Sequence, residues 1–123
     1  MLNIDRAYIA VALVLLVLGE ALGLYMGIVN DTQLLSVHVA FLLPGFATLA
    51  AYGFIFRLWP GMKKGRLAAT QFWLAVVAEI GLIIGAYQFA VSRAVPLAAG
   101  ASVLTMVAAL LLVYLFWTRS AQA

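Results

Sequence analysis

The chain has 123 residues, of which 67% are hydrophobic and only 9% are charged, and its formal net charge is +3. A soluble globular domain is nearer half apolar and a quarter charged, so this composition excludes a soluble enzyme, a disordered chain and a nucleic-acid-binding module. Because roughly 20 apolar residues cross a bilayer, we expect one transmembrane domain over residues 1–123, embedded in lipid.

Four long apolar runs, separated by short polar turns, predict four membrane-spanning helices. Lipid requires every backbone polar group to be hydrogen-bonded within its own segment, and runs of this length are too long for strands. The first run also lacks the short apolar core and the cleavage pattern of a signal peptide. Short loops join antiparallel neighbours, so we expect an all-α, up-down-up-down four-helix bundle. The predicted helices cover residues 8–29, 34–59, 67–90 and 96–117.

Lys and Arg residues are distributed unequally between the two ends of this bundle. Of the seven, only Arg93 lies on the side opposite the termini. An excess of Lys and Arg marks cytoplasmic loops. The sequence therefore predicts a multi-pass protein of the inner (cytoplasmic) membrane, with both termini in the cytoplasm. The six residues on the predicted cytoplasmic side are Arg6, Arg57, Lys63, Lys64, Arg66 and Arg119.

Glycines recur every four residues on the first and third predicted helices. In lipid, helices associate by close packing, which such small residues permit. Two interpretations remain open: the glycines pack the helices of one chain together, or they form an interface between subunits. Four helices enclose little interior, so we also expect self-association. The glycines are Gly19, Gly23 and Gly27 on the first helix and Gly81 and Gly85 on the third.

Two glutamates interrupt the apolar runs and are candidate proton or cation sites. Glu20 lies 12 residues after Tyr8, and Glu79 lies 12 residues after Leu67. At ~1.5 Å per residue, both carboxyls lie about 18 Å into the membrane. A charge at this depth is costly, so we expect both side chains to face the bundle or an interface, and at least one of them to stay protonated. They are either a proton relay or cation site, or protonated groups bonded to backbone, Ser102, Thr105 or Gln88.

His38 is the only histidine, and the chain has no cysteine. His38 is therefore the only candidate imidazole or thiolate ligand for a metal. It precedes Pro44, which cannot donate a hydrogen bond to the carbonyl of Ala40 and therefore predicts a kink in the second helix. His38, Gly45 and Tyr52 recur every seven residues and should share one helix face. A glycine on that face would let a flat macrocycle lie against the helix. His38 and Gly45 are thus candidate cofactor-binding residues.

The second predicted helix and its flanks resemble a family of small four-helix membrane proteins related to the catalytic subunit of the haem-copper oxidases and nitric oxide reductases. The resemblance rests on the segment around His38 and Gly45, and on the aromatic-Arg-Leu-aromatic-Pro exit in Tyr52–Pro60. Gly23–Gly27 and Gln71–Leu74 also match the family pattern. The resemblance covers about residues 15 to 80.

The chain departs from this family at most of the expected ligand positions. Where the family has further histidines, this sequence has Ala40, Gln71 and Ala75, and Leu42 replaces an asparagine. The resemblance therefore implies at most a haem b held from one side by His38. Because the large oxidase subunit consists of three four-helix arcs, the resemblance also implies a homotrimer, or a place in a larger respiratory membrane complex.

Two functions of different classes follow. In the first, the protein binds haem b through His38 for redox or gas-ligand chemistry. In the second, it is a cofactor-free homo-oligomeric or accessory membrane subunit in which Glu20 and Glu79 are structural or conduct protons. Binding is favoured over enzyme activity in both, since the second metal site of the family has lost its histidines.

Overall fold

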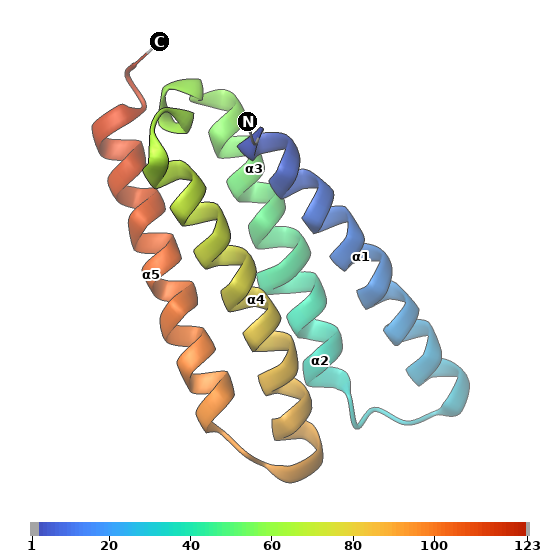
Figure 1. The fold of residues 1–123 in the computed structure, drawn as a ribbon. Helices are drawn as coiled ribbons and strands as arrows, with labels where there is room; N and C mark the ends of the chain where they lie inside the picture. The colour runs from blue at the N-terminus through green and yellow to red at the C-terminus, as the bar shows by residue number, and fades with distance from the viewer. Residues whose placement is uncertain (1–2, 123) are drawn as a thin grey trace.

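A computed structural model describes residues 3–122 and confirms the all-α, four-helix fold (Figure 1). Three of the four membrane spans are single helices: α1 covers Ile4–Val29, α4 covers Arg66–Ser92 and α5 covers Pro96–Arg119. Each is long and apolar enough to cross a bilayer. The largest difference from the predicted boundaries is at α1, which begins four residues earlier than expected because the polar segment before Tyr8 continues the helix.

The second span, Leu35–Leu58, consists of three consecutive elements. It begins as α2 (Leu35–Ala40), widens into the π-helix η1 (Phe41–Ala47) and continues as α3 (Thr48–Leu58). The 3-10 turn η2 (Pro60–Lys63) then leads into α4. Neighbouring spans run antiparallel, and both ends of the described chain lie at one end of the bundle, here called the terminal end (Figure 1).

The proline in the second span produces a π-helix in place of the predicted simple kink. Pro44 lies in the middle of η1. In a π-helix each N–H bonds the carbonyl five residues earlier, so the missing N–H of Pro44 does not leave the carbonyl of Ala40 without a possible donor. The N–H of Thr48 donates to Leu43 in this pattern. The wider turn accommodates the proline without interrupting the span.

The spans follow one another across the molecule in the order α5, α4, second span and α1 (Figure 1). α1 packs on η1 and α3, α2 packs on α4, and α4 packs on α5. The buried core is concentrated in the half near the termini. Its largest fully buried apolar side chains come from α1, α3, η2 and α5 and are Tyr8, Leu49, Phe56, Met62 and Leu115.

Four of the five glycines singled out in the sequence pack helices within one chain. A Cβ on Gly19 would lie 2.7 Å from Leu42, and a Cβ on Gly23 would lie 2.7 Å from the His38 ring. Gly81 and Gly85 provide similar close approaches of α4 to Ala101 and Ala98 on α5. By contrast, a Cβ on Gly27 would meet no side chain or neighbouring helix within 4 Å among residues 3–122. The intrachain interpretation is therefore confirmed for all of these glycines except Gly27.

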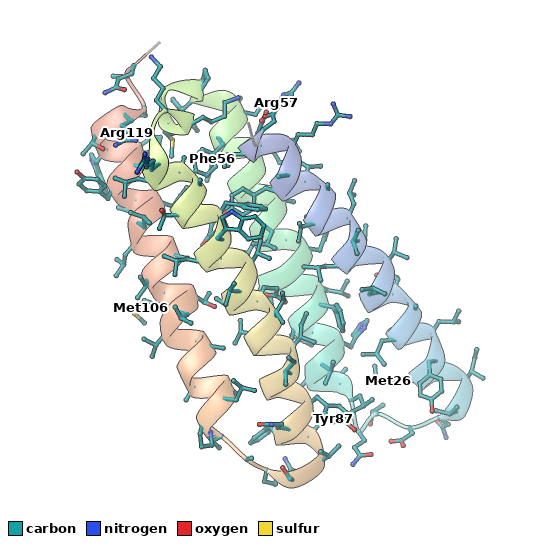
Figure 2. The ribbon with its side chains drawn as sticks, in the orientation of Figure 1. Met26, Phe56, Arg57, Tyr87, Met106 and Arg119 are labelled. Atoms are coloured by element: carbon teal, nitrogen blue, oxygen red, sulfur yellow. The ribbon has the colours of Figure 1, made fainter. Side chains whose placement is uncertain are left out.

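The outer surface of the bundle is apolar along most of its length. Large hydrophobic side chains, Met106 among them, are exposed on all four spans (Figure 2). The charged side chains of Arg57 and Arg119 lie at the terminal end in the same view. An apolar belt with charges at its end is the surface that a bilayer requires. The fold is that of a membrane protein.

Candidate functional site

Glu79 is the buried carboxyl inside the bundle. It lies on α4, its relative exposure is 3%, and its Oε1 has no hydrogen-bond partner among the described residues. Space for the carboxyl comes from Gly45 in η1, since a Cβ at this glycine would lie 3.0 Å from Oε1 of Glu79. The π-helical turn and the glutamate therefore lie against each other. A buried carboxyl oxygen without a hydrogen-bond partner is rare in folded proteins and therefore calls for an explanation.

Glu79 is one of the residues that line a cavity of about 10 Å³. A volume of this size accommodates roughly one water molecule. The cavity lies between the second span, α4 and α5. Besides Glu79, its lining consists of three hydroxyl-bearing residues and four apolar ones. The lining residues are Pro44, Thr48, Leu49, Tyr52, Ala75, Glu79, Thr105 and Ala108.

The two threonines of this cavity use their hydroxyl hydrogens elsewhere. Oγ1 of Thr48 donates to the carbonyl of Leu43 at 3.0 Å, and Oγ1 of Thr105 donates to the carbonyl of Ala101 at 3.0 Å. A carbonyl oxygen can only accept, so each hydroxyl must be the donor. Both oxygens therefore have only lone pairs left for the cavity. Thr105 was among the partners that the sequence suggested for the glutamates, and it borders the cavity without a hydrogen bond to Glu79.

Polar side chains continue from this cavity toward the terminal end. The ring of Tyr52 lies edge-on to that of Tyr8, with centroids 5.7 Å apart. The hydroxyl of Tyr8 donates to Oε1 of Gln71 at 2.5 Å, and Nε2 of Gln71 donates to the carbonyl of Ala108 at 3.1 Å. Tyr8 and Gln71 are fully buried. Sequence reasoning did not find this pair, although a glutamine in an apolar run was the available signal.

Glu20 does not share the cavity with Glu79. Its side chain is exposed on α1, whereas the carboxyl of Glu79 is buried between the second span and α4. The expectation that both carboxyls face the bundle is wrong for Glu20 in the single chain, and only the expectation of an interface stays open. Counting residues gives the depth of a side chain, but an apolar helix carries no signal for the direction in which it points.

His38 packs against α1. Its Nδ1 lies 2.8 Å from the carbonyl oxygen of Gly19, and because this oxygen only accepts, Nδ1 donates the hydrogen. The ring covers Gly23. Within the described residues, no three His, Cys, Asp or Glu side chains converge as a metal site.

Gly45 does not form the macrocycle face expected beside His38. A Cβ at Gly45 would meet Glu79 at 3.0 Å and Leu15 at 3.1 Å, so side chains of the chain itself already fill this surface. A π-helical turn contains more residues than an α-helical one, and it breaks the seven-residue repeat. The His38 ring faces Gly23 on α1, whereas Gly45 lies against Glu79. The residues present therefore do not fit a haem stacked on Gly45.

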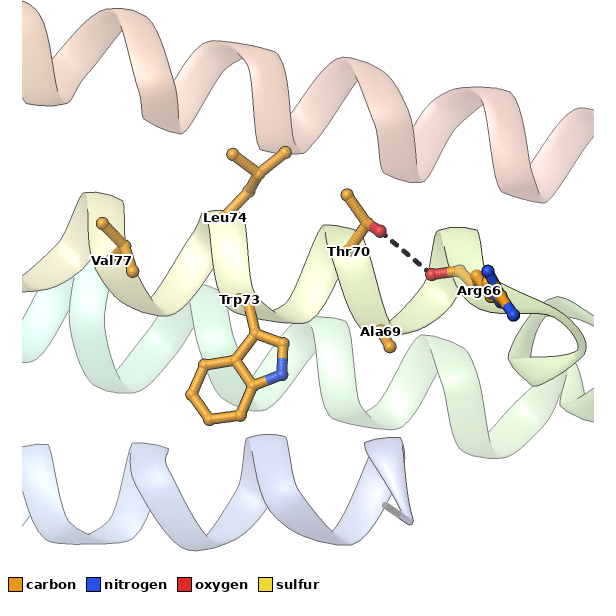
Figure 3. A pocket seen from close by; sticks show the side chains of 6 residues that line it. All are labelled: Arg66, Ala69, Thr70, Trp73, Leu74 and Val77. Carbon is orange, nitrogen blue, oxygen red and sulfur yellow. Dashed lines mark hydrogen bonds between the residues drawn. The ribbon is translucent and has the colours of Figure 1, made fainter. Parts of the chain in front are cut away.

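A larger, open groove of about 500 Å³ lies on one face of α4, apart from Glu79 (Figure 3). It is lined by the indole of Trp73, by neighbouring apolar side chains and by Arg66 and Thr70. Oγ1 of Thr70 donates to the carbonyl of Arg66 at 3.0 Å, the same bond within a helix that Thr105 makes. Thr70 thus provides a matched control for the cavity threonine.

In comparisons with known proteins, no family model, no curated protein and no solved structure matches the chain. The resemblance to the oxidase catalytic subunit therefore stays a prediction, and the site is interpreted from its own geometry.

Proposed function

We propose that the protein is a cofactor-free, self-associating subunit of the inner membrane in which Glu79 binds and releases a proton. The observation that carries the proposal is the Glu79 carboxyl, 3% exposed and without a hydrogen-bond partner for Oε1. Ionisable groups inside membrane spans are rare, and they typically mark proton or ion pathways. The small cavity and the π-helical turn beside Glu79 add support, since π-helical turns are frequent at functional sites.

The polar groups near Glu79 indicate the side from which the proton exchanges. Tyr52 borders the cavity, and Tyr8 and Gln71 extend the polar region toward the terminal end. In this proposal the proton reaches Oε1 of Glu79 from that end, past the Tyr52 hydroxyl. Release follows the same path in reverse.

Infrared difference spectroscopy of the purified protein tests this function. At neutral pH, Glu79→Gln should remove one carboxyl C=O band that Glu20→Gln retains. Tyr52→Phe should keep the band but slow its isotope shift in D₂O, because it removes the one cavity-lining hydroxyl that is not donated to a backbone carbonyl. If the wild type lacks the band at neutral pH in sodium-free buffer, or if Glu79→Gln retains it, the proposal is wrong.

The proposed self-association rests on Glu20, whose exposed carboxyl lies within an apolar span. We propose that a second copy covers it, because a carboxyl in contact with lipid costs several kcal/mol. Glu20 is 16 residues from the start of α1, and the exposed Ser102 is 17 residues from the end of α5. At ~1.5 Å per residue both are about 25 Å from the terminal end, so Ser102 of a neighbouring copy can lie at the depth of Glu20, with its hydroxyl hydrogen donated to the carbonyl of Ala98 at 2.8 Å.

Contacts between α1 of one copy and α5 of the next would repeat head to tail and close a ring, with a trimer favoured. Native mass spectrometry in mild detergent should show this oligomer for the wild type. Glu20→Lys should shift it toward monomer, and Ser92→Ala, at the exposed end of α4, should leave it unchanged. A monomeric wild type would contradict the proposal.

Haem b binding through His38 is a second candidate function. The contact of Nδ1 with the Gly19 carbonyl favours it, because a ligating histidine usually donates its other ring hydrogen in this way. Two observations weigh against it: side chains of the chain fill the surface at Gly45, and the His38 ring packs against Gly23 on α1. The optical spectrum of the purified protein decides: a Soret band that His38→Ala abolishes supports haem binding, and a colourless protein supports the cofactor-free subunit.

A further inference from the structure

The cavity beside Glu79 offers an excess of hydrogen-bond acceptors. The hydroxyl hydrogens of Thr48 and Thr105 are donated to the carbonyls of Leu43 and Ala101, which leaves two oxygen atoms with lone pairs. Oε1 of Glu79 is a third oxygen without a donor. Of the hydroxyls lining the cavity, only that of Tyr52 is not donated to a backbone carbonyl. Such a lining is matched by a cation, which needs only lone pairs, or by a water molecule, which donates hydrogen bonds.

The charge and the volume of this cavity narrow the choice of cation. One carboxylate balances one positive charge, whereas a divalent ion would leave a net charge buried among apolar residues. A cavity of about 10 Å³ is the size of one water molecule. A carboxylate and two or three hydroxyl oxygens are hard ligands, which suit a small, hard cation.

We propose that the cavity beside Glu79 binds a single sodium ion, with Glu79, Thr48 and Thr105 as ligands and Tyr52 as a fourth. This inference rests on the proposed function, because sodium and the proton use the same carboxyl. The exchange is balanced: the O–H bond of the Glu79 carboxyl breaks, the proton leaves toward the terminal end, and the carboxylate becomes a sodium ligand. The cavity borders η1 through Pro44, and π-helical turns are frequent at functional sites.

The test is the carboxyl C=O band of Glu79, followed at constant pH while sodium chloride or potassium chloride is added to the purified full chain. Sodium should remove the band and potassium should not. Thr105→Val should raise the sodium concentration needed by about tenfold, the change expected when one charge-assisted contact is lost. Thr70→Val should behave as the wild type, because Thr70 makes the same bond within α4 but lies outside the cavity.

The outcomes separate this inference from the proposed function. If the band titrates with pH but does not respond to sodium, the sodium site is wrong and the proton function stands. If the wild type has no such band at any pH in sodium-free buffer, both are wrong. An equal response to potassium, or an equal loss of sodium affinity in Thr70→Val and Thr105→Val, also overturns the sodium site.

Discussion

Asp5 and Glu79 are both buried carboxyls, but only Asp5 has charged partners. One oxygen of Asp5 lies 3.2 Å from Arg57 and the other lies 3.5 Å from Lys63. These contacts hold the start of α1 against the end of the second span and η2. In the sequence, Arg57 and Lys63 indicated only the orientation in the membrane. Their ion pairs with Asp5 depend on the packing of α1 on α3, which no local sequence pattern encodes.

Asp5→Asn should destabilise the protein by about 2 kcal/mol. The value lies between the small contribution of an exposed ion pair and the larger cost of breaking a buried one, because the Asp5 side chain is 4% exposed whereas that of Arg57 is 71% exposed. Unfolding of the purified protein in denaturing detergent measures the change. Asp31→Asn, in the exposed turn at the opposite end, should cost less than half as much. Equal effects would show that the Asp5 pairs add nothing.

The two intramembrane glutamates show what a sequence can and cannot give for a site. Their depth follows from counting residues, and the identification of Glu79 as a buried carboxyl was correct. Whether Glu20 points inward was not predictable, because the residues around it are apolar on every side of α1. In a soluble helix the polar face would have supplied the direction, but lipid and protein interior select similar side chains.

At the scale of elements, the four spans were predictable because lipid leaves few alternatives to a helix for long apolar runs. Pro44 correctly marked the irregular part of the second span. The π-helix itself was not predictable, since a proline is compatible with a kink, a break or a wider turn. This difference matters for the site, because the His38 ring lies against Gly23, whereas Gly45 lies between Leu15 and Glu79.

Gly23→Ala should destabilise the monomer by about 1–3 kcal/mol, the usual range for overpacking. Its Cβ would lie 2.7 Å from the His38 ring, and displacing the ring would also break the contact of Nδ1 with the Gly19 carbonyl. Gly27→Ala is the matched control on the same helix, because its Cβ would meet no side chain or neighbouring helix within 4 Å among the described residues. Detergent unfolding should show Gly27→Ala equal to the wild type or more stable. A larger loss in Gly27→Ala would place the critical glycine contact at a subunit interface.

At the scale of the whole molecule, the terminal end holds most of the cationic residues and the contacts that join η2 to the C-terminal residues. Gly61 in η2 lies directly against the backbone of Arg119 and Gln122, and the Arg119 guanidinium donates to the carbonyl of Lys64. The N-terminus, the loop between α3 and α4, and the C-terminus are thus joined at one end. Translocating any one of these segments across the membrane would require all of them to cross.

We therefore predict that this whole end lies in the cytoplasm, as the excess of Lys and Arg indicates. The chain has no cysteine, so single cysteines can report the side of the membrane without background. In intact cells, a membrane-impermeant thiol reagent should label Thr32→Cys, in the exposed turn between α1 and α2, and should not label Gln122→Cys, which is equally exposed at the terminal end. Both variants should react once the membrane is made permeable. Labelling of Gln122→Cys in intact cells, with Thr32→Cys protected, would reverse the orientation, and with it the side from which the proton reaches Glu79.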